Sequence, residues 1–121
     1  IMELIGNKPE EVLGTVHYGH DFWRFKSAYF TKEPDEPTFA EEFHTFSLFW
    51  REDCLRFAVD GEFYGDPITP SVTLPTGYPF NEEFYLILNI AVGGNLPGNP
   101  DGSTVFPQEM EIDYIRVYEE N

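Results

Sequence analysis

The chain has 121 residues and carries 22 Asp and Glu against 7 Lys and Arg, which gives a formal charge of −15. Because nucleic acids and anionic membrane surfaces are bound through clusters of Lys and Arg, this balance argues against both kinds of partner, and no apolar run approaches the ~20 residues that span a bilayer. The hydrophobic share of 41% and the aromatic share of 17% predict one folded domain rather than a disordered acidic segment.

Short runs rich in Phe, Tyr, Val and Ile alternate with Gly, Pro, Asn and Asp along the chain. This pattern is typical of an all-β protein and predicts a β-sandwich. Strands are expected first at residues 1–5, 12–18 and 23–30. The acidic, proline-flanked segment 33–37 follows them and is predicted to be a solvated connection.

The next strand is predicted at residues 43–51, where side chains alternate between two faces as a pleated strand requires. One face would carry His44 together with Phe46, Leu48 and Trp50. His44 is therefore expected at the edge of the core. A hairpin follows, because Asp60-Gly61 is a two-residue link favoured in type I′ turns and joins two apolar runs.

The C-terminal third predicts two further strands. Residues 84–92 are apolar except at Asn89, which indicates a central strand that is buried on both faces. Residues 110–118 predict the last strand. A lone buried amide needs partners for its donors and acceptors, so Asn89 either ties the sheet together or reaches a ligand.

Cys54 is the only cysteine, so the chain can form no intramolecular disulfide. It stands between Asp53 and Leu55 in a strand-like run. We interpret it as a buried strand thiol rather than a nucleophile.

Glu3 is a carboxylate between apolar neighbours on a predicted strand. Such a position costs desolvation unless the face opens to a cleft, and desolvation raises a carboxyl pKa toward the range that a general acid needs. The alternative is a strand-end glutamate that points into water.

His17 can donate and accept hydrogen bonds at once, so it is a candidate for binding a sugar hydroxyl, although a strand histidine is often structural. Trp23 offers a flat apolar ring suited to stacking on a pyranose, although most aromatic side chains of a sandwich belong to the core. The chain shows neither a nucleophile elbow nor the His and Cys spacing of a metal site.

Seven segments occur in an order that is characteristic of a known family. They are Ile1-Met2-Glu3, Gly14-Thr15-Val16-His17-Tyr18-Gly19, Phe43-His44-Thr45-Phe46, Val59-Asp60-Gly61, Leu88-Asn89-Ile90-Ala91-Val92-Gly93-Gly94-Asn95, Thr104-Val105-Phe106-Pro107-Gln108 and Ile112-Asp113-Tyr114-Ile115-Arg116-Val117-Tyr118. Together they resemble the C-terminal half of glycoside hydrolase family 16, and within it the laminarinases, which are endo-β-1,3-glucanases.

The resemblance implies a concanavalin-like jelly roll of which residues 1–121 are a partial catalytic domain that starts within the active-site strand. The family's motif is Glu-x-Asp-x-x-Glu, and Glu3 matches its last residue, the general acid/base. The nucleophile would lie upstream of Ile1, and a β-bulge would bring the two glutamates to one face. The implied reaction is retaining hydrolysis of a laminarin-type β-glucan, for which the chain alone would be inactive.

The resemblance also places His17, Trp23 and Asn89 along the glucan cleft. The sequence departs from the family pattern at Leu96, where a Trp is usual. Asp113 resembles a ligand of a structural calcium whose other ligands would come from the absent half.

The implied partners are a β-glucan and the complementary N-terminal half of the domain, and the acidic composition fits a secreted protein. Two other hypotheses stay open: a non-catalytic β-glucan-binding protein of the same fold, and an inactive fragment.

Overall fold

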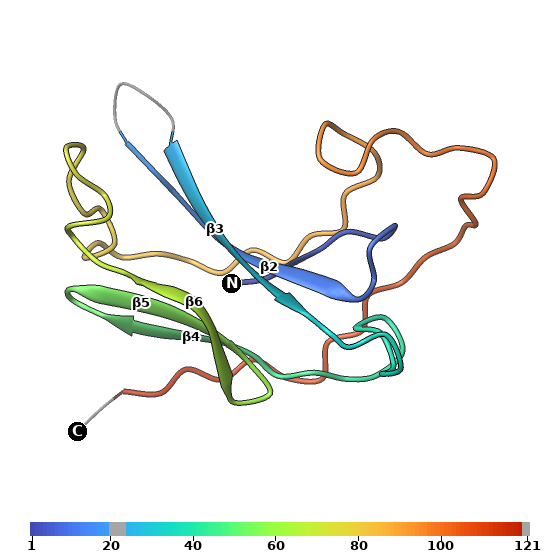
Figure 1. Ribbon diagram of the computed structural model, residues 1–121, viewed down its shortest axis with the longest axis horizontal. Coiled ribbons are helices and arrows are strands. Elements are labelled where there is room, and N and C mark those ends of the chain that lie inside the picture. The colour runs from blue at the N-terminus through green and yellow to red at the C-terminus, as the bar shows by residue number, and fades with distance from the viewer. Residues whose placement is uncertain (20–23, 120–121) are drawn as a thin grey trace. The chain divides into compact units, whose positions relative to one another are not determined.

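The computed structural model describes residues 1–19 and 24–119 (Figure 1). The chain divides into two compact units, Ile1–Tyr85 and Leu86–Asn121. The described strands all lie in the first unit, and they are β1 (Glu3–Leu4), β2 (Glu11–Tyr18), β3 (Arg24–Thr31), β4 (Phe46–Arg51), β5 (Cys54–Val59) and β6 (Glu62–Ile68). Within the described ranges, no helix is long and apolar enough to cross a membrane.

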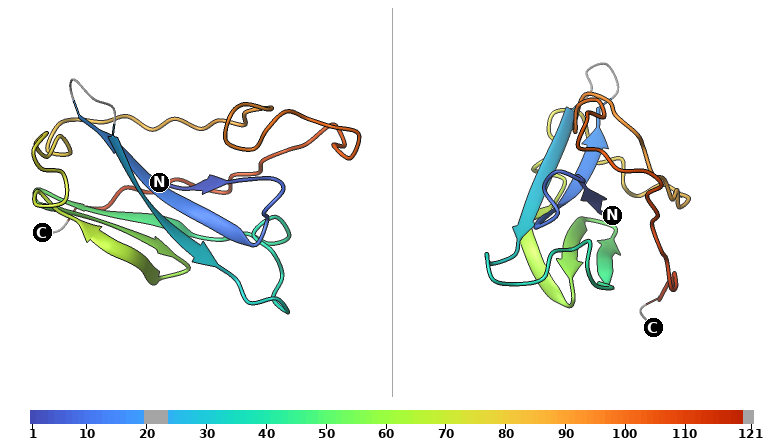
Figure 2. Two further views of the ribbon diagram at one scale, coloured as in Figure 1. Left: turned by 45° about the horizontal axis from the view of Figure 1, so that its top comes forward. Right: turned by 90° about the vertical axis from the view of Figure 1, so that its right-hand side faces the viewer.

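The strands of the first unit form two antiparallel sheets, β1-β2-β3 and β4-β5-β6. Figure 2 shows the two sheets as layers of one sandwich. The core between them contains Val12 and Val16 from β2, and Phe57 and Val59 from β5. The structure therefore confirms the predicted β-sandwich.

Glycine permits the closest approach between the two sheets. Gly14 lies between Val12 and Val16 on the inner face of β2, where the ring of Phe57 packs directly against its backbone. A Cβ atom at Gly14 would collide with that ring. The alternation of Val, Gly and Val on β2 thus sets how deeply Phe57 enters the core.

The predicted hairpin is confirmed. Strands β5 and β6 pair on either side of Asp60 and Gly61, with Val59 opposite Glu62. Both turn residues have positive φ, 50° at Asp60 and 86° at Gly61, as a type I′ link requires. Local sequence was sufficient here because the two strands are adjacent in the chain.

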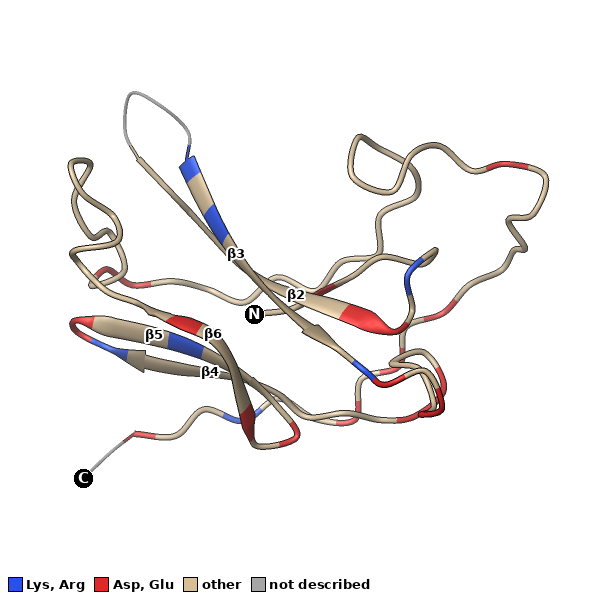
Figure 3. Cartoon of the chain, viewed as in Figure 1, with Lys and Arg blue, Asp and Glu red and all other residues tan. Residues whose placement is uncertain are grey.

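Most acidic residues lie in the connections, and few lie within strands. Figure 3 shows Asp and Glu in the connection that follows β3 and in the turns of the β4-β5-β6 sheet. Residues 33–37 are exposed, which confirms the predicted solvated connection.

Two predicted strands are absent from the described residues. Residues 84–92 and 110–118 have no ladder partner, and their side chains are exposed rather than buried on both faces. A central strand needs a neighbouring strand on each edge to pair its backbone N–H and C=O groups. The prediction of these two strands is therefore wrong for the described residues, because their apolar side chains find neither a ladder partner nor a covering layer there.

Candidate active-site face

Glu3 lies on the outward face of the β1-β2-β3 sheet. Its strand pairs with β2 so that Glu3 stands opposite Leu13, and opposite residues of an antiparallel ladder point to the same side. The inward side of the same sheet carries Val12 and Val16, which are buried in the core. Met2, next to Glu3, also packs against the core, so Glu3 must point outward.

The pairing of β2 with β3 assembles rows of side chains across this outward face. Tyr29 stands opposite Leu13 and therefore shares a row with Glu3. In the next row the hydroxyl oxygens of Thr15 and Ser27 are 3.0 Å apart. The face therefore combines a carboxyl group, hydroxyls and an aromatic ring, which are groups that suit a polyhydroxylated ligand.

His17 forms the last described row with Phe25, and the centroids of their rings are 6.2 Å apart. His17 is exposed and points to the same side as Glu3. Since Leu13 and His17 are four positions apart on one strand, the side chains of Glu3 and His17 are separated by about 13 Å along the sheet. The two predicted site residues thus share a face, but they would contact different points of an extended ligand.

The burial expected around Glu3 is not observed. Glu3 is exposed, and its neighbours Ile1 and Leu4 are 49% and 37% exposed. The exposure agrees with the alternative of a strand-end glutamate that points into water: Met2 and Leu4 alternate to the other side of the strand, although Leu13, which stands opposite Glu3, is itself buried.

A second carboxylate on this face was missed from the sequence. Glu11 has the same parity on β2 as Leu13 and His17, and it pairs with Lys8 at 3.5 Å. No local sequence signal reveals it, because Glu11 shares a face with Glu3 only through the register between β1 and β2. Unlike Glu3, Glu11 is neutralised by a neighbouring ammonium group and is only 19% exposed.

The other predicted site residues are not brought to this face by the described structure. Trp23 lies outside the described residues. Asn89 is exposed and belongs to no strand, which corrects the expectation of a buried amide; its predicted strand found no partner. Cys54 is partly buried at the start of β5, in agreement with a strand thiol.

The residues around Asp113 do not form a calcium site by themselves. Asp113 is exposed, and no group of three or more His, Cys, Asp or Glu side chains that could hold a metal ion occurs among the residues described. A calcium ion would need oxygen ligands from elsewhere in the protein, and no step of the chemistry below depends on it.

Comparison with known proteins identifies the family. A model of the glycosyl hydrolases family 16 matches residues 1–116. The chain belongs to this family. In agreement, the structure superposes on that of the endo-β-1,3-glucanase from Pyrococcus furiosus with a TM-score of 0.76 and 38% identity, over 88% of this chain and 41% of the other. The fold is the family's jelly roll.

Proteins similar to this chain include enzymes and a glucan-binding protein. Glucan endo-1,3-beta-glucosidase A1 of Niallia circulans is 38% identical over 131 residues, which covers 99% of this chain and 19% of the relative. The beta-1,3-glucan-binding protein of Penaeus monodon is 31% identical over 84% of this chain and 34% of the relative. The chain therefore spans less than half the length of each of these proteins, as expected for the C-terminal half of the domain.

Proposed function

We propose that the complete protein is a retaining endo-β-1,3-glucanase that cleaves laminarin-type β-glucan, with Glu3 as general acid/base. The observation that supports this role is the position of Glu3 on the outward face of β1-β2-β3, in a row with Tyr29 and beside the Thr15 and Ser27 hydroxyls. Membership of the family supplies the reaction class.

In the first step the neutral carboxyl group of Glu3 donates its proton to the glycosidic oxygen while the bond from that oxygen to the anomeric carbon breaks. A second carboxylate, from residues that precede Ile1, attacks the anomeric carbon from the opposite side and forms the glycosyl-enzyme. Retaining glycosidases hold these two carboxyl groups about 5–5.5 Å apart. The exposure of Glu3 leaves its oxygen atoms accessible to both the sugar and this partner.

In the second step the ionised Glu3 removes a proton from water, and the water oxygen attacks the anomeric carbon and releases the nucleophile. Glu3 is thereby reprotonated and the original configuration is restored. One carboxyl group therefore serves first as acid and then as base.

The remaining side chains would bind and orient the glucan. His17 can exchange hydrogen bonds with a sugar hydroxyl about 13 Å from Glu3 along the sheet. We assign Trp23 and Asn89 to the same cleft on the resemblance of their segments to the family. For the same reason we assign Asp113 to a structural calcium and expect the N-terminal half of the domain to supply the missing strands.

The test compares Glu3→Gln with Glu11→Gln in the complete protein. Both changes remove a carboxylate from the same face at equal size, but only Glu3 is assigned to proton transfer. Glu3→Gln should lower reducing-sugar release from laminarin by ~10²–10⁴-fold, the usual contribution of general acid–base catalysis, while laminarin binding is retained. Glu11→Gln should keep most of the activity. Near-normal hydrolysis by Glu3→Gln would refute the assignment.

The second candidate function is β-glucan binding without hydrolysis. It is favoured by the identity of 31% with a beta-1,3-glucan-binding protein. The same experiment separates the two functions. If the protein only binds β-glucan, the unmodified protein will bind laminarin but release no reducing sugar from it.

A further inference from the structure

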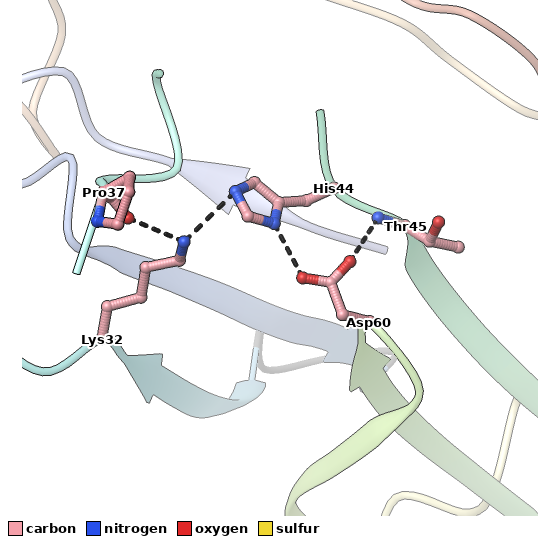
Figure 4. A network of polar contacts seen from close by, with 5 residues as sticks. All are labelled: Lys32, Pro37, His44, Thr45 and Asp60. Carbon is pink, nitrogen blue, oxygen red and sulfur yellow. Dashed lines mark hydrogen bonds and ion pairs between the residues drawn. The ribbon is translucent and has the colours of Figure 1, made fainter. Parts of the chain in front are cut away.

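A network of hydrogen bonds and polar contacts links the connection between β3 and β4 to the turn between β5 and β6 (Figure 4). Lys32, directly after β3, donates from Nζ to the carbonyl oxygen of Pro37 at 2.7 Å and lies 3.3 Å from Nε2 of His44. Nδ1 of His44 lies 2.7 Å from Oδ2 of Asp60. The other oxygen of Asp60 accepts the backbone N–H of Thr45 at 2.8 Å.

The partners of His44 define its protonation state. An ammonium group has only donors, so Lys32 can bond to Nε2 only when that nitrogen carries no proton. Nδ1 faces a carboxylate, which accepts, so Nδ1 must carry the ring proton. This geometry therefore requires a neutral imidazole with its hydrogen on Nδ1.

The ring of His44 is enclosed, so it cannot turn freely to water. Its side chain is 7% exposed. The ring centroid lies 5.0 Å from that of Phe39 and 6.3 Å from that of Phe46. The same Phe39 ring lies 4.9 Å from Nζ of Lys32, which places the ammonium over an aromatic face.

The charged groups around His44 come from three segments. Lys32 faces it from the end of β3 and Asp60 from the hairpin turn. Glu36 and Glu62 line an adjoining hollow of about 190 Å³ together with Lys32 and Asp60. A charge that appears on His44 is therefore attracted by the carboxylates but meets the ammonium of Lys32 at hydrogen-bond distance.

We propose that the protonation state of His44 controls how firmly the β3–β4 connection is held. The neutral ring accepts a hydrogen bond from Lys32, and protonation of the ring breaks this bond. Protonation puts a hydrogen on Nε2, so the acceptor of Lys32 is lost and two cations face each other at 3.3 Å. The bond to Asp60 becomes charge-assisted and keeps His44 in place. Lys32 is thus the group that moves, and its contact with Pro37 loosens with it.

The state of Asp60 supports this order of events. Burial opposes ionisation of Asp60, but the hydrogen bonds from Thr45 and His44 outweigh it and, with the charges of His44 and Lys32, lower the pKa of this carboxyl. Asp60 is therefore already ionised in the range, about pH 5–8, in which histidine side chains change charge.

Hydrogen exchange of the complete protein between about pH 5 and pH 8, corrected for intrinsic exchange rates, tests the proposal. The backbone amides of Lys32, Glu33 and Glu36, which donate hydrogen bonds in the structure, should lose protection several-fold as the pH falls through this range. The contact of Glu41 in the same connection does not interfere, because hydrogen bonds from Thr38 lower the pKa of this carboxyl group.

Lys32→Gln removes the ammonium but keeps an N–H donor, so this variant should lose the pH step. Lys26→Gln, which changes an exposed lysine of β3 that takes no part in these contacts, is the control and should retain it. The proposal is overturned if the unmodified protein shows no step, or if the step persists in Lys32→Gln.

The ring itself provides a second readout that does not depend on loop stability. Nitrogen-15 NMR of labelled histidine, assigned with His44→Gln, should show at pH 8 a ring that is protonated on Nδ1 and unprotonated on Nε2. A hydrogen on Nε2 at this pH would contradict the bond from Lys32.

Discussion

Asp60 combines a strained turn position with two hydrogen bonds. Its φ of 50° lies in the left-handed region, which Asn also tolerates, and its carboxylate accepts from both His44 and the Thr45 N–H. Asp60→Asn preserves the turn and one acceptor oxygen but removes the negative charge beside His44. The substitution therefore isolates the charge-dependent part of the contact.

We predict that Asp60→Asn lowers the free energy of unfolding of the complete protein at pH 7 by about 1 kcal/mol, a modest figure because the side chain is half exposed. The pKa of Asp60 is lowered in the folded protein, so its stabilising effect is present above the unfolded pKa of about 3.9 and is lost as the pH falls through the folded value. Urea unfolding at pH 7 and again near pH 3 should show the difference shrinking in acid. An equal difference at both pH values would be inconsistent with a charge effect.

At the scale of elements, the approach of β2 to β5 depends on the missing side chain of Gly14. Gly14→Ala would place a Cβ against the ring of Phe57, between two fully packed strands. Overpacking of this kind costs about 1–3 kcal/mol. Urea titration of the complete protein should therefore show a lower midpoint for Gly14→Ala.

Gly6→Ala is the matched control, because nothing lies within 4 Å of a Cβ at Gly6. This variant should unfold at nearly the midpoint of the unmodified protein. If the two alanine variants were equally stable, the close approach of the sheets would not be a constraint.

The elements that could be predicted from sequence are those whose partners are near in the chain. The residues of β2 and of the β5–β6 hairpin carry alternating side chains and turn signals that are complete within a few positions. The register between β1 and β2 could not be predicted, because nothing local says that Glu3 stands opposite Leu13. For this reason Glu3 could be singled out as a candidate, whereas its companions Tyr29 and Glu11 could not.

At the scale of the whole molecule, the second unit stands out because many of its apolar side chains are exposed. Exposed side chains there include Ile87 at 72% and Val117 at 82%, and the described residues 86–119 contain no strand. Exposed apolar side chains in such number are typical of an interaction surface. The sequence predicted these segments as strands because their composition is that of buried strands, but the described residues offer them no strand to pair with.

We therefore predict that residues 1–121 alone do not unfold cooperatively and bind a hydrophobic dye such as ANS, whereas the complete protein melts in a single transition without dye binding. Size-exclusion chromatography and thermal melting of both samples would measure this. A cooperative melt of the isolated chain as a monomer would show that it needs no complementary half.

The role of Glu3 as the proton donor is tested most directly with Glu3→Ala in the complete protein and an aryl β-glucan oligosaccharide whose leaving group departs without protonation. The variant should cleave this substrate but barely act on laminarin. Added azide, which needs no general base, should restore turnover and yield the β-glycosyl azide, since it attacks the glycosyl-enzyme from the side that water would use. An α-glycosyl azide would make Glu3 the nucleophile instead, and undiminished cleavage of laminarin would remove it from the chemistry altogether.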